Sequence, residues 1–352
     1  ELDDAQHTAS FAYIEQNKTQ SLTYFEFSTL SALHLFKQAK LDVVILEVGL
    51  GGRLDATNIV DNDMAVITSI DIDHTDFLGS TRDQIGFEKA GIFRANKPVI
   101  IGEPNIPQTM LAYAETLACQ LFCRHLDWHF SQQEQGWTWQ TTREDEKVWW
   151  NLLADLPLCH IPLANAATAL AAVQKLPFEI SLEIVKKSLL EVELTGRFQT
   201  MKPESLMYLA QMVQREVEAL PRMIVDVGHN PHAARYLAEK LSALKAQSQG
   251  KLIAVCGILK DKDAVGVLTP LLPLVDEWRC VTLGGYRGQR GEDLFVTLQQ
   301  IATQQHLNAQ GSYANSVAEG VKSAVEIANE NDTVLVFGSF HTVGEFMTLI
   351  QA

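Results

Sequence analysis

The sequence predicts an α/β protein of two domains, each built on a mostly parallel sheet. Short apolar runs bounded by glycine and aspartate recur along the chain, at residues 43–46, 64–70, 223–227, 252–256 and 333–337. Runs of this length are typical of strands buried on both faces of a parallel sheet. Segments with helical spacing separate the runs, which is the order of a doubly wound α/β domain. A chain of 352 residues is long enough for two such domains.

Composition and charge restrict the classes of function that the protein can have. The formal net charge is −15 and 47% of the residues are hydrophobic. The acidic excess argues against nucleic acid as the main partner, since phosphate binding needs a basic surface. No apolar run approaches the length of a membrane span, and no signal peptide is visible. The five cysteines are odd in number and sit mostly in apolar contexts, so we expect reduced thiols in a cytoplasmic protein.

Four of the possible metal ligands lie close together in the sequence, at Cys119, Cys123, His125 and His129. Their spacing matches no familiar zinc pattern, and the segment changes from a predicted helix to a predicted strand inside the group. We therefore expect core thiols and surface imidazoles here, not a zinc site.

The elements of the first domain follow from local patterns. Residues 1–20 are polar and are expected to end in a loop, and a helix is expected after Ser21. After the strands at 43–46 and 64–70, a helix is expected over 79–93, where Thr81 and Gln84 form a capping box. Further along we expect a strand, a helix, a small β excursion with packing tryptophans and two more helices, at 97–102, 107–120, 128–150, from 163, and 181–192.

The first two predicted strands each end on a polar side chain. Glu47 follows the run at 43–46, and His74 follows the run at 64–70. Ligands of parallel sheets bind beyond the carboxyl ends of the strands. A carboxylate and an imidazole side by side there predict a site for a divalent cation.

A glycine-rich stretch at 49–52 allows two other interpretations. One is a flexible turn without function. The other is a dinucleotide-binding loop, but Leu54 stands where the third glycine belongs, and residues 55–58 are turn formers that do not begin an amphipathic helix.

Together, residues 46–58 (LEVGLGGRLDATN) resemble the signature of the folylpolyglutamate synthase and dihydrofolate synthase family, which are ATP-dependent amide ligases related to the Mur ligases. Residues 69–74 and 88–92 match the next two family motifs in order. The resemblance covers nearly the whole chain and is closest to the bifunctional bacterial enzymes. It implies a Mur-ligase-like, P-loop-type ATPase domain over 1–196 and a Rossmann-like domain over 197–352.

The resemblance also implies roles for single residues. The pterin would face Thr23, Tyr24, Phe25, Glu26, Leu54, Asp55 and Ala56. Glu47 and His74 would hold one Mg²⁺, and Lys89 would help to hold another, carbamylated so that its cationic amine becomes an anionic oxygen ligand. The residues alone also allow interpretations without function. Lys89 and Glu88 could be a solvated ion pair, Asn165 could be a helix cap, and Asp226 could accept hydrogen bonds at a helix start. The resemblance also implies that ATP is contacted by Asn165, Arg197, Asp226 and His229.

One family element has no counterpart in the sequence. No Gly-x-x-Gly-Lys-Ser/Thr loop occurs in the 352 residues, although such loops hold phosphate through backbone N–H groups and a lysine. We expect a chain truncated at its N-terminus, without the first strand and the phosphate loop, and inactive by itself.

The second domain alternates strand and helix from residue 223 onward. Asn230 and Pro231 predict a helix start, and strands are expected at 252–256, 279–283 and 333–337. Residues 203–221 carry a helical pattern and form a long link for which the sequence suggests no function.

The resulting hypothesis is a monomeric, cytoplasmic ligase that uses magnesium ATP to join L-glutamate to dihydropteroate and to folates through an acyl phosphate. Three alternatives remain open: a Mur-type amino-acid ligase, a dinucleotide-dependent oxidoreductase, and a non-catalytic folate-binding remnant. The first lacks a visible uridine-nucleotide domain, the second lacks its glycine fingerprint, and the third is favoured by the absent phosphate loop.

Overall fold

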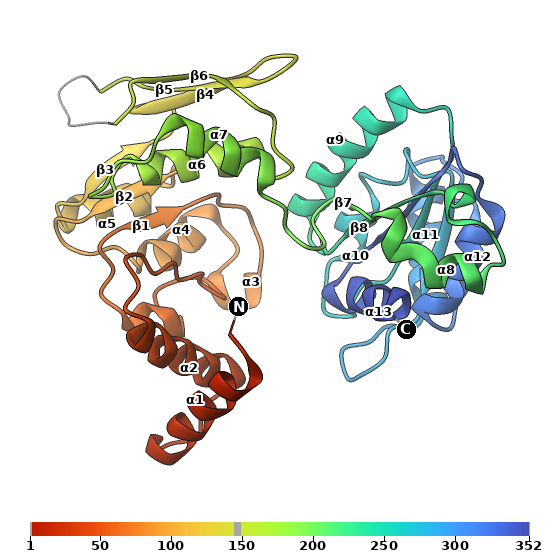
Figure 1. Ribbon diagram of the computed structural model, residues 1–352, viewed down its shortest axis with the longest axis horizontal. Helices are drawn as coiled ribbons and strands as arrows, with labels where there is room; N and C mark the ends of the chain where they lie inside the picture. Colours follow the sequence, from red (N-terminus) through yellow and green to blue (C-terminus); the bar gives the residue numbers. More distant parts are fainter. Residues whose placement is uncertain (1, 144–148, 352) are drawn as a thin grey trace. The chain divides into compact units, whose positions relative to one another are not determined.

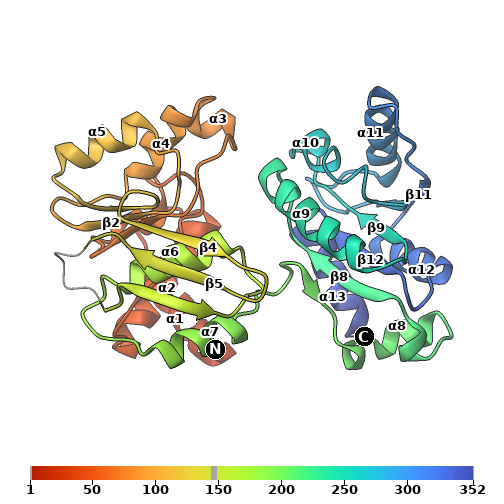
Figure 2. The same cartoon turned by 90° about the horizontal axis from the view of Figure 1, so that it is seen from above.

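The computed structural model describes residues 2–143 and 149–351. Contacts between Cα atoms divide the chain into two compact units, Glu1–Leu190 and Glu191–Ala352. Figures 1 and 2 show both units, and each is described by itself below. Within the two described ranges, none of the helices combines the length and the apolar character that crossing a membrane requires.

The first unit is layered around a short parallel sheet. Its strands β1 (Ala65–Ile67), β2 (Pro98–Ile101) and β3 (Gln120–Cys123) pair in that order. Seven helices and a 3-10 turn accompany the sheet: α1 (Asp4–Asn17), α2 (Tyr24–Ala39), η1 (Ala56–Ile59), α3 (Thr75–Leu78), α4 (Arg82–Ala90), α5 (Gln108–Thr116), α6 (Leu163–Val173) and α7 (Leu182–Glu191). One core joins one sheet face to α4 and α5, and a second joins the other face to α6 and α7.

The predicted β excursion is an antiparallel sheet on the outer side of α6 and α7 (Figure 1). It consists of β4 (Trp128–Gln132), β5 (Trp137–Thr141) and β6 (Leu152–Leu156). Trp128, Trp137 and Trp139 are fully buried in the core shared with α6, which confirms them as packing residues. Residues 144–148 of the predicted excursion lie outside the described residues.

The polar N-terminal stretch forms the helix α1, which begins with a capping box between Asp3 and Gln6. One prediction for this part of the chain is wrong. The run at 43–46 was expected to be a strand, but it has no regular structure, and Ile45 is 86% exposed. An apolar run becomes a strand only when neighbouring strands take up its backbone groups, and this run has none in the described sheet.

The second unit is a doubly wound domain. Its sheet has the order β11-β10-β9-β12-β8-β7, parallel except for the short β7. The strands are β7 (Gln199–Thr200), β8 (Arg222–Asp226), β9 (Leu252–Cys256), β10 (Glu277–Val281), β11 (Gly311–Ala314) and β12 (Thr333–Phe337). Along β12, Val334 and Val336 enter one core while Leu335 and Phe337 enter the other. This alternation places the helices on both faces, as the sequence predicts.

Helices α8 (Met207–Met212), α12 (Val317–Ile327) and α13 (Phe340–Ile350) cover one face of this sheet. Helices α9 (Pro231–Gln247), α10 (Ala264–Leu268) and α11 (Gly291–Gln304) cover the other. The link at 203–221 folds into η2 (Pro203–Leu206), α8 and η3 (Val217–Ala219). Its Arg215 donates to the carbonyls of Val325, Glu326 and Ala328 at the C-terminus of α12, so the link has a structural role.

All five cysteines are free thiols. Burial, with a contribution from Asp127, raises the pKa of Cys123 to about 12. Burial likewise raises the pKa of Cys280 to about 12, so both thiols stay protonated at neutral pH and are poor metal ligands.

Candidate active site

The glycine loop between Gly49 and η1 is organised by one carboxylate. Asp55 Oδ2 accepts from the backbone N–H of Gly49 and of Leu50, at 3.0 and 3.1 Å. Its Oδ1 accepts from the N–H and the hydroxyl of Thr57, at 2.9 and 2.7 Å. Both oxygens of a residue predicted to face the pterin are therefore bonded within the loop, whereas the neighbouring Leu54 is 80% exposed.

The same loop is fixed to the C-terminal half of α4. Arg53 pairs with Glu88 at 2.9 Å, and its backbone N–H donates to the Glu88 carbonyl at 2.8 Å. The amide of Asn58 donates to the carbonyls of Arg53 and Gly91. A Cβ at Gly91 would lie 2.3 Å from Arg53 Cβ, so this close approach requires glycine. Glu88, which the sequence allows as a solvated partner of Lys89, is instead paired with Arg53.

The predicted pterin residues at the start of α2 divide into two kinds. Thr23 and Glu26 form a capping box, with Glu26 Oε2 accepting from the Thr23 N–H at 2.7 Å. The positions of these two side chains are therefore accounted for by their role in capping the helix. The ring of Phe25 lies on Gly49, where an added Cβ would come within 2.9 Å of it, and Tyr24 is 89% exposed. Two aromatic faces next to the glycine loop remain available for a flat heterocycle.

Lys89 is the next-to-last residue of α4 and is half-buried. Burial lowers the pKa of Lys89, and the nearby Asp73 carboxylate acts in the opposite direction. Asp73 also lies 3.9 Å from Nε2 of His74. The structure therefore brings Asp73 close to both Lys89 and His74. The sequence reasoning did not single out Asp73, although it stands beside His74 in the matched motif.

Glu47 is exposed and lies in the irregular segment that was predicted as a strand. Among residues 2–143 and 149–351, no three His, Cys, Asp or Glu side chains are grouped as a cation site. The donor chemistry nevertheless fits a hard cation if Lys89 carries a carbamate, because Asp73, His74 and the carbamate would then supply oxygen and nitrogen ligands.

Asn165 is on the first turn of α6, whose N-cap is Pro162. It is therefore not the cap that the sequence allows. One turn later, Thr168 approaches Gly102 so closely that an added Cβ there would lie 2.2 Å from its hydroxyl. Gly102 directly follows β2, so α6 begins near the carboxyl end of the sheet.

In the second unit, Asp226 joins two loops at the end of β8. Its Oδ2 accepts from the Phe198 N–H at 2.9 Å, and its Oδ1 accepts from the Gly228 N–H at 2.6 Å. Burial raises the pKa of this carboxyl, against the opposing effect of the two backbone N–H groups. The ring of His229 and the guanidinium of Arg197 lie 6.1 and 5.9 Å from the ring of Phe340. Arg197, Asp226 and His229 therefore share one end of the sheet with the start of α13.

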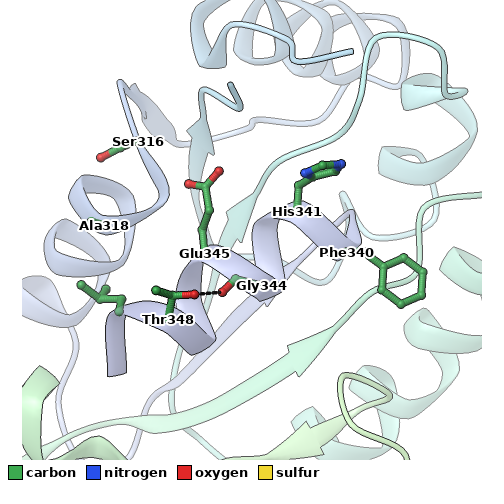
Figure 3. Close-up of a pocket in the computed structure, with 8 residues that line it drawn as sticks. Ser316, Ala318, Phe340, His341, Gly344, Glu345 and Thr348 are labelled. Atoms are coloured by element: carbon green, nitrogen blue, oxygen red, sulfur yellow. Dashed lines mark hydrogen bonds between the residues drawn. The ribbon is translucent and has the colours of Figure 1, made fainter. Parts of the chain in front are cut away.

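An open pocket of about 640 Å³ lies beside this helix start (Figure 3). Its lining includes Ser316, which caps α12, and Phe340, His341 and Glu345 of α13. Figure 3 shows His341 and Glu345 on the same side of α13. The start of α13 is fixed by its own side chains, because Ser339 caps the helix and the Thr342 hydroxyl donates to the Gly257 carbonyl at 2.7 Å.

Comparison with known proteins agrees with this architecture. The Mur ligase middle domain matches residues 2–145, and the Mur ligase glutamate ligase domain matches residues 210–340. The dihydrofolate synthase/folylpolyglutamate synthase of Haemophilus influenzae is 63% identical over 352 residues, which is 100% of this chain and 78% of that protein. The chain belongs to the dihydrofolate synthase/folylpolyglutamate synthase family.

Other members of this family have solved structures. Escherichia coli FolC in complex with DHPP and ADP has a TM-score of 0.87 at 46% identity, covering 100% of this chain and 77% of that chain. A bifunctional folylpolyglutamate synthase/dihydrofolate synthase with Mn, AMPPNP and L-glutamate bound has a TM-score of 0.84 at 45% identity, covering 100% and 78%. The fold is thus that of the Mur ligases, and the relatives bind a nucleotide and a divalent metal.

Proposed function

We propose that this protein is an ATP-dependent ligase that joins L-glutamate to dihydropteroate and to folates. The observation that carries the proposal is the position of Lys89. It is a half-buried amine with a lowered pKa, it faces Asp73, and it lies on the helix that holds the glycine loop. A lowered pKa favours carbamate formation, because only the unprotonated amine adds carbon dioxide.

In the proposed reaction, a carboxylate oxygen of the substrate attacks the γ-phosphorus of ATP, and ADP leaves. The amino nitrogen of glutamate then attacks the acyl carbon, phosphate leaves with the electron pair of the broken C–O bond, and the nitrogen loses a proton. A magnesium ion held by these residues would neutralise charge on the phosphates. The protein mainly positions the reactants and provides opposite charge.

The residues take the following proposed roles. Glu47, His74 and carbamylated Lys89 hold the magnesium, with Asp73 beside them. The pterin lies against Tyr24, Phe25 and Leu54, while Thr23, Glu26, Asp55 and Ala56 shape the segments around it. The nucleotide is contacted by Asn165, Arg197, Asp226 and His229.

The test is glutamate-dependent ADP release by the full-length product of the gene, with dihydropteroate and with tetrahydrofolate as acceptors. Release that requires both glutamate and the acceptor supports the proposal. Release without glutamate, or none with either acceptor, contradicts it.

We also propose that a polypeptide of these 352 residues alone does not catalyse the reaction. The sequence contains no Gly-x-x-Gly-Lys-Ser/Thr loop, and each charge-assisted hydrogen bond to phosphate contributes about 1.5–3 kcal/mol. Equal turnover by this polypeptide and by the full-length product would show that such a loop is dispensable.

A further inference from the structure

The loop between β1 and α3, residues 68–74, carries Asp73 and His74 and is held from outside at its middle. The N–H of Ile70 donates to Glu103 Oε2 at 2.9 Å. The carbonyl of Ile70 accepts from Nη1 of Arg82. Both backbone groups of one buried loop residue are therefore bonded to side chains from other elements.

Arg82 and Glu103 also bind each other, and we name this pair the Arg82–Glu103 clasp. Nη2 of Arg82 lies 3.0 Å from Glu103 Oε1, and the Glu103 side chain is only 8% exposed. The same Nη2 donates to the Asn105 carbonyl at 2.7 Å, and Glu103 Oε1 accepts from the Asn105 N–H at 2.9 Å. The clasp thus joins the first turn of α4 to the loops after β1 and β2.

The clasp connects the two sides of the proposed cation site. Arg82 is the first residue of α4, and Lys89 follows seven positions later, about 10 Å further along the same rigid helix. The other end of the clasp holds Ile70, three residues before Asp73. Fixing Ile70 to α4 therefore fixes Asp73 and His74 relative to Lys89.

Stability alone does not account for this arrangement. An ion pair between the buried Glu103 and the partly exposed Arg82 adds little net stability, because the cost of removing charge from water offsets much of the attraction. The clasp lies at the carboxyl ends of β1 and β2, the edge at which parallel sheets bind ligands. Hydrogen-bond partners behind metal ligands typically change metal affinity by about 10–100-fold when they are replaced.

We propose that Arg82 and Glu103 are positioning residues, which hold the loop at 68–74 so that Asp73 and His74 face Lys89 across a divalent-cation site. This inference rests on the proposed function for the identity of the site. It assigns to Arg82 and Glu103 no contact with the cation or the substrates.

The experiment measures Mn²⁺ affinity by calorimetry, at a fixed concentration of AMPPNP, in the full-length gene product. Glu103→Gln keeps the size of the side chain and removes its charge, and Arg82→Lys keeps the charge and removes the forked geometry. Both variants should bind Mn²⁺ about tenfold more weakly, and hydrogen exchange over residues 68–74 should accelerate. Asp63→Asn is the matched control, because it removes the exposed Lys97–Asp63 pair of the same unit and should leave both measurements unchanged.

Wild-type Mn²⁺ affinity in a folded Glu103→Gln or Arg82→Lys variant overturns the proposal, as does a wild-type protein that binds no Mn²⁺. If Glu103→Gln does not fold, Arg82→Lys decides. A wild-type protein that binds Mn²⁺ but releases no ADP with glutamate contradicts the proposed function, while the affinities of the two variants still decide the positioning role.

Discussion

Asp55 provides the sharpest test of how the glycine loop works, because the structure and the family resemblance suggest different roles for it. The resemblance assigns Asp55 to the pterin, whereas its carboxylate accepts four hydrogen bonds from the loop itself. Asp55→Asn keeps one acceptor oxygen and replaces the other by an NH₂ group. That group then faces either the N–H groups of Gly49 and Leu50 or the two donors of Thr57.

If the NH₂ group faces Gly49 and Leu50, the variant loses both of their hydrogen bonds. If it faces Thr57, the bond from the Thr57 N–H is lost, while the Thr57 hydroxyl can accept from the NH₂ group. A hydrogen bond to a charged group contributes about 1.5–3 kcal/mol when buried. The loop is partly exposed, and the remaining bonds lose their ionic acceptor, so we expect a loss of about 2 kcal/mol. That value reduces the population of the ordered loop relative to open forms by roughly 30-fold. Asp55→Ala loses all four bonds and should have the larger effect.

The assay combines hydrogen exchange over residues 49–57 with steady-state kinetics of the full-length gene product. For Asp55→Asn we expect faster exchange together with a raised KM for dihydropteroate, because the substrate must first order the loop. Asp61→Asn is the control, because the Asp61 side chain is exposed and pairs with Arg94 outside the glycine loop. A raised KM with unchanged exchange would refute the reasoning, because Asp55 would then contact the substrate directly.

Three further predictions concern the proposed ligands and the second unit. Glu47→Ala should abolish activity in the full-length product without lowering its melting temperature, since Glu47 is exposed; equal loss of both would indicate a structural role. Lys89→Ala should be inactive and partly rescued by short carboxylates that replace the carbamate. No rescue, together with an unmodified lysine at high bicarbonate by mass spectrometry, would count against the carbamate. Burial raises the pKa of Asp226, so the folded state binds this proton more tightly than the unfolded state does. The stability from this group is complete below the unfolded pKa of about 3.9 and is lost as the pH rises through the folded pKa. In urea unfolding, the free energy of unfolding of Asp226→Asn should therefore rise relative to that of the wild type as the pH is raised from acid to neutral. A difference in unfolding free energy that does not change with pH would contradict this.

Much of the fold could be predicted from local sequence signals, because the structure forms the corresponding contacts between residues that are close in the sequence. Asn230 caps α9 with Pro231 at its first position, and Thr81 and Gln84 form the expected capping box of α4. The four strands predicted for the second unit, β8, β9, β10 and β12, agree with their apolar runs to within two residues at each end, whereas the short β7 and the edge strand β11 were not predicted. A helix cap depends on the residues next to it, so a single sequence contains the information needed to predict it.

The run at 43–46 shows where this reasoning fails. Val43, Val44 and Ile45 form the same kind of apolar run as β9 or β12, yet they remain irregular and exposed. A strand depends on partners whose positions the sequence does not state. The contacts that define the candidate site have the same difficulty, because Arg53 meets Glu88, and Arg82 meets Glu103, across 35 and 21 positions.

His74 illustrates what a motif cannot specify. Its residue type predicts a ligand, but its backbone is left-handed, with φ of 51°, a conformation that costs a non-glycine residue about 1–2 kcal/mol. Such a conformation persists only where its surroundings impose it. Here the His74 N–H is held by the Asp73 carboxylate, the His74 carbonyl accepts the first bonds of α3, and Ile70 is fixed by the clasp. Because the unfavourable geometry coincides with a proposed ligand, the loop is better understood as built to aim the imidazole than as a simple connection between a strand and a helix.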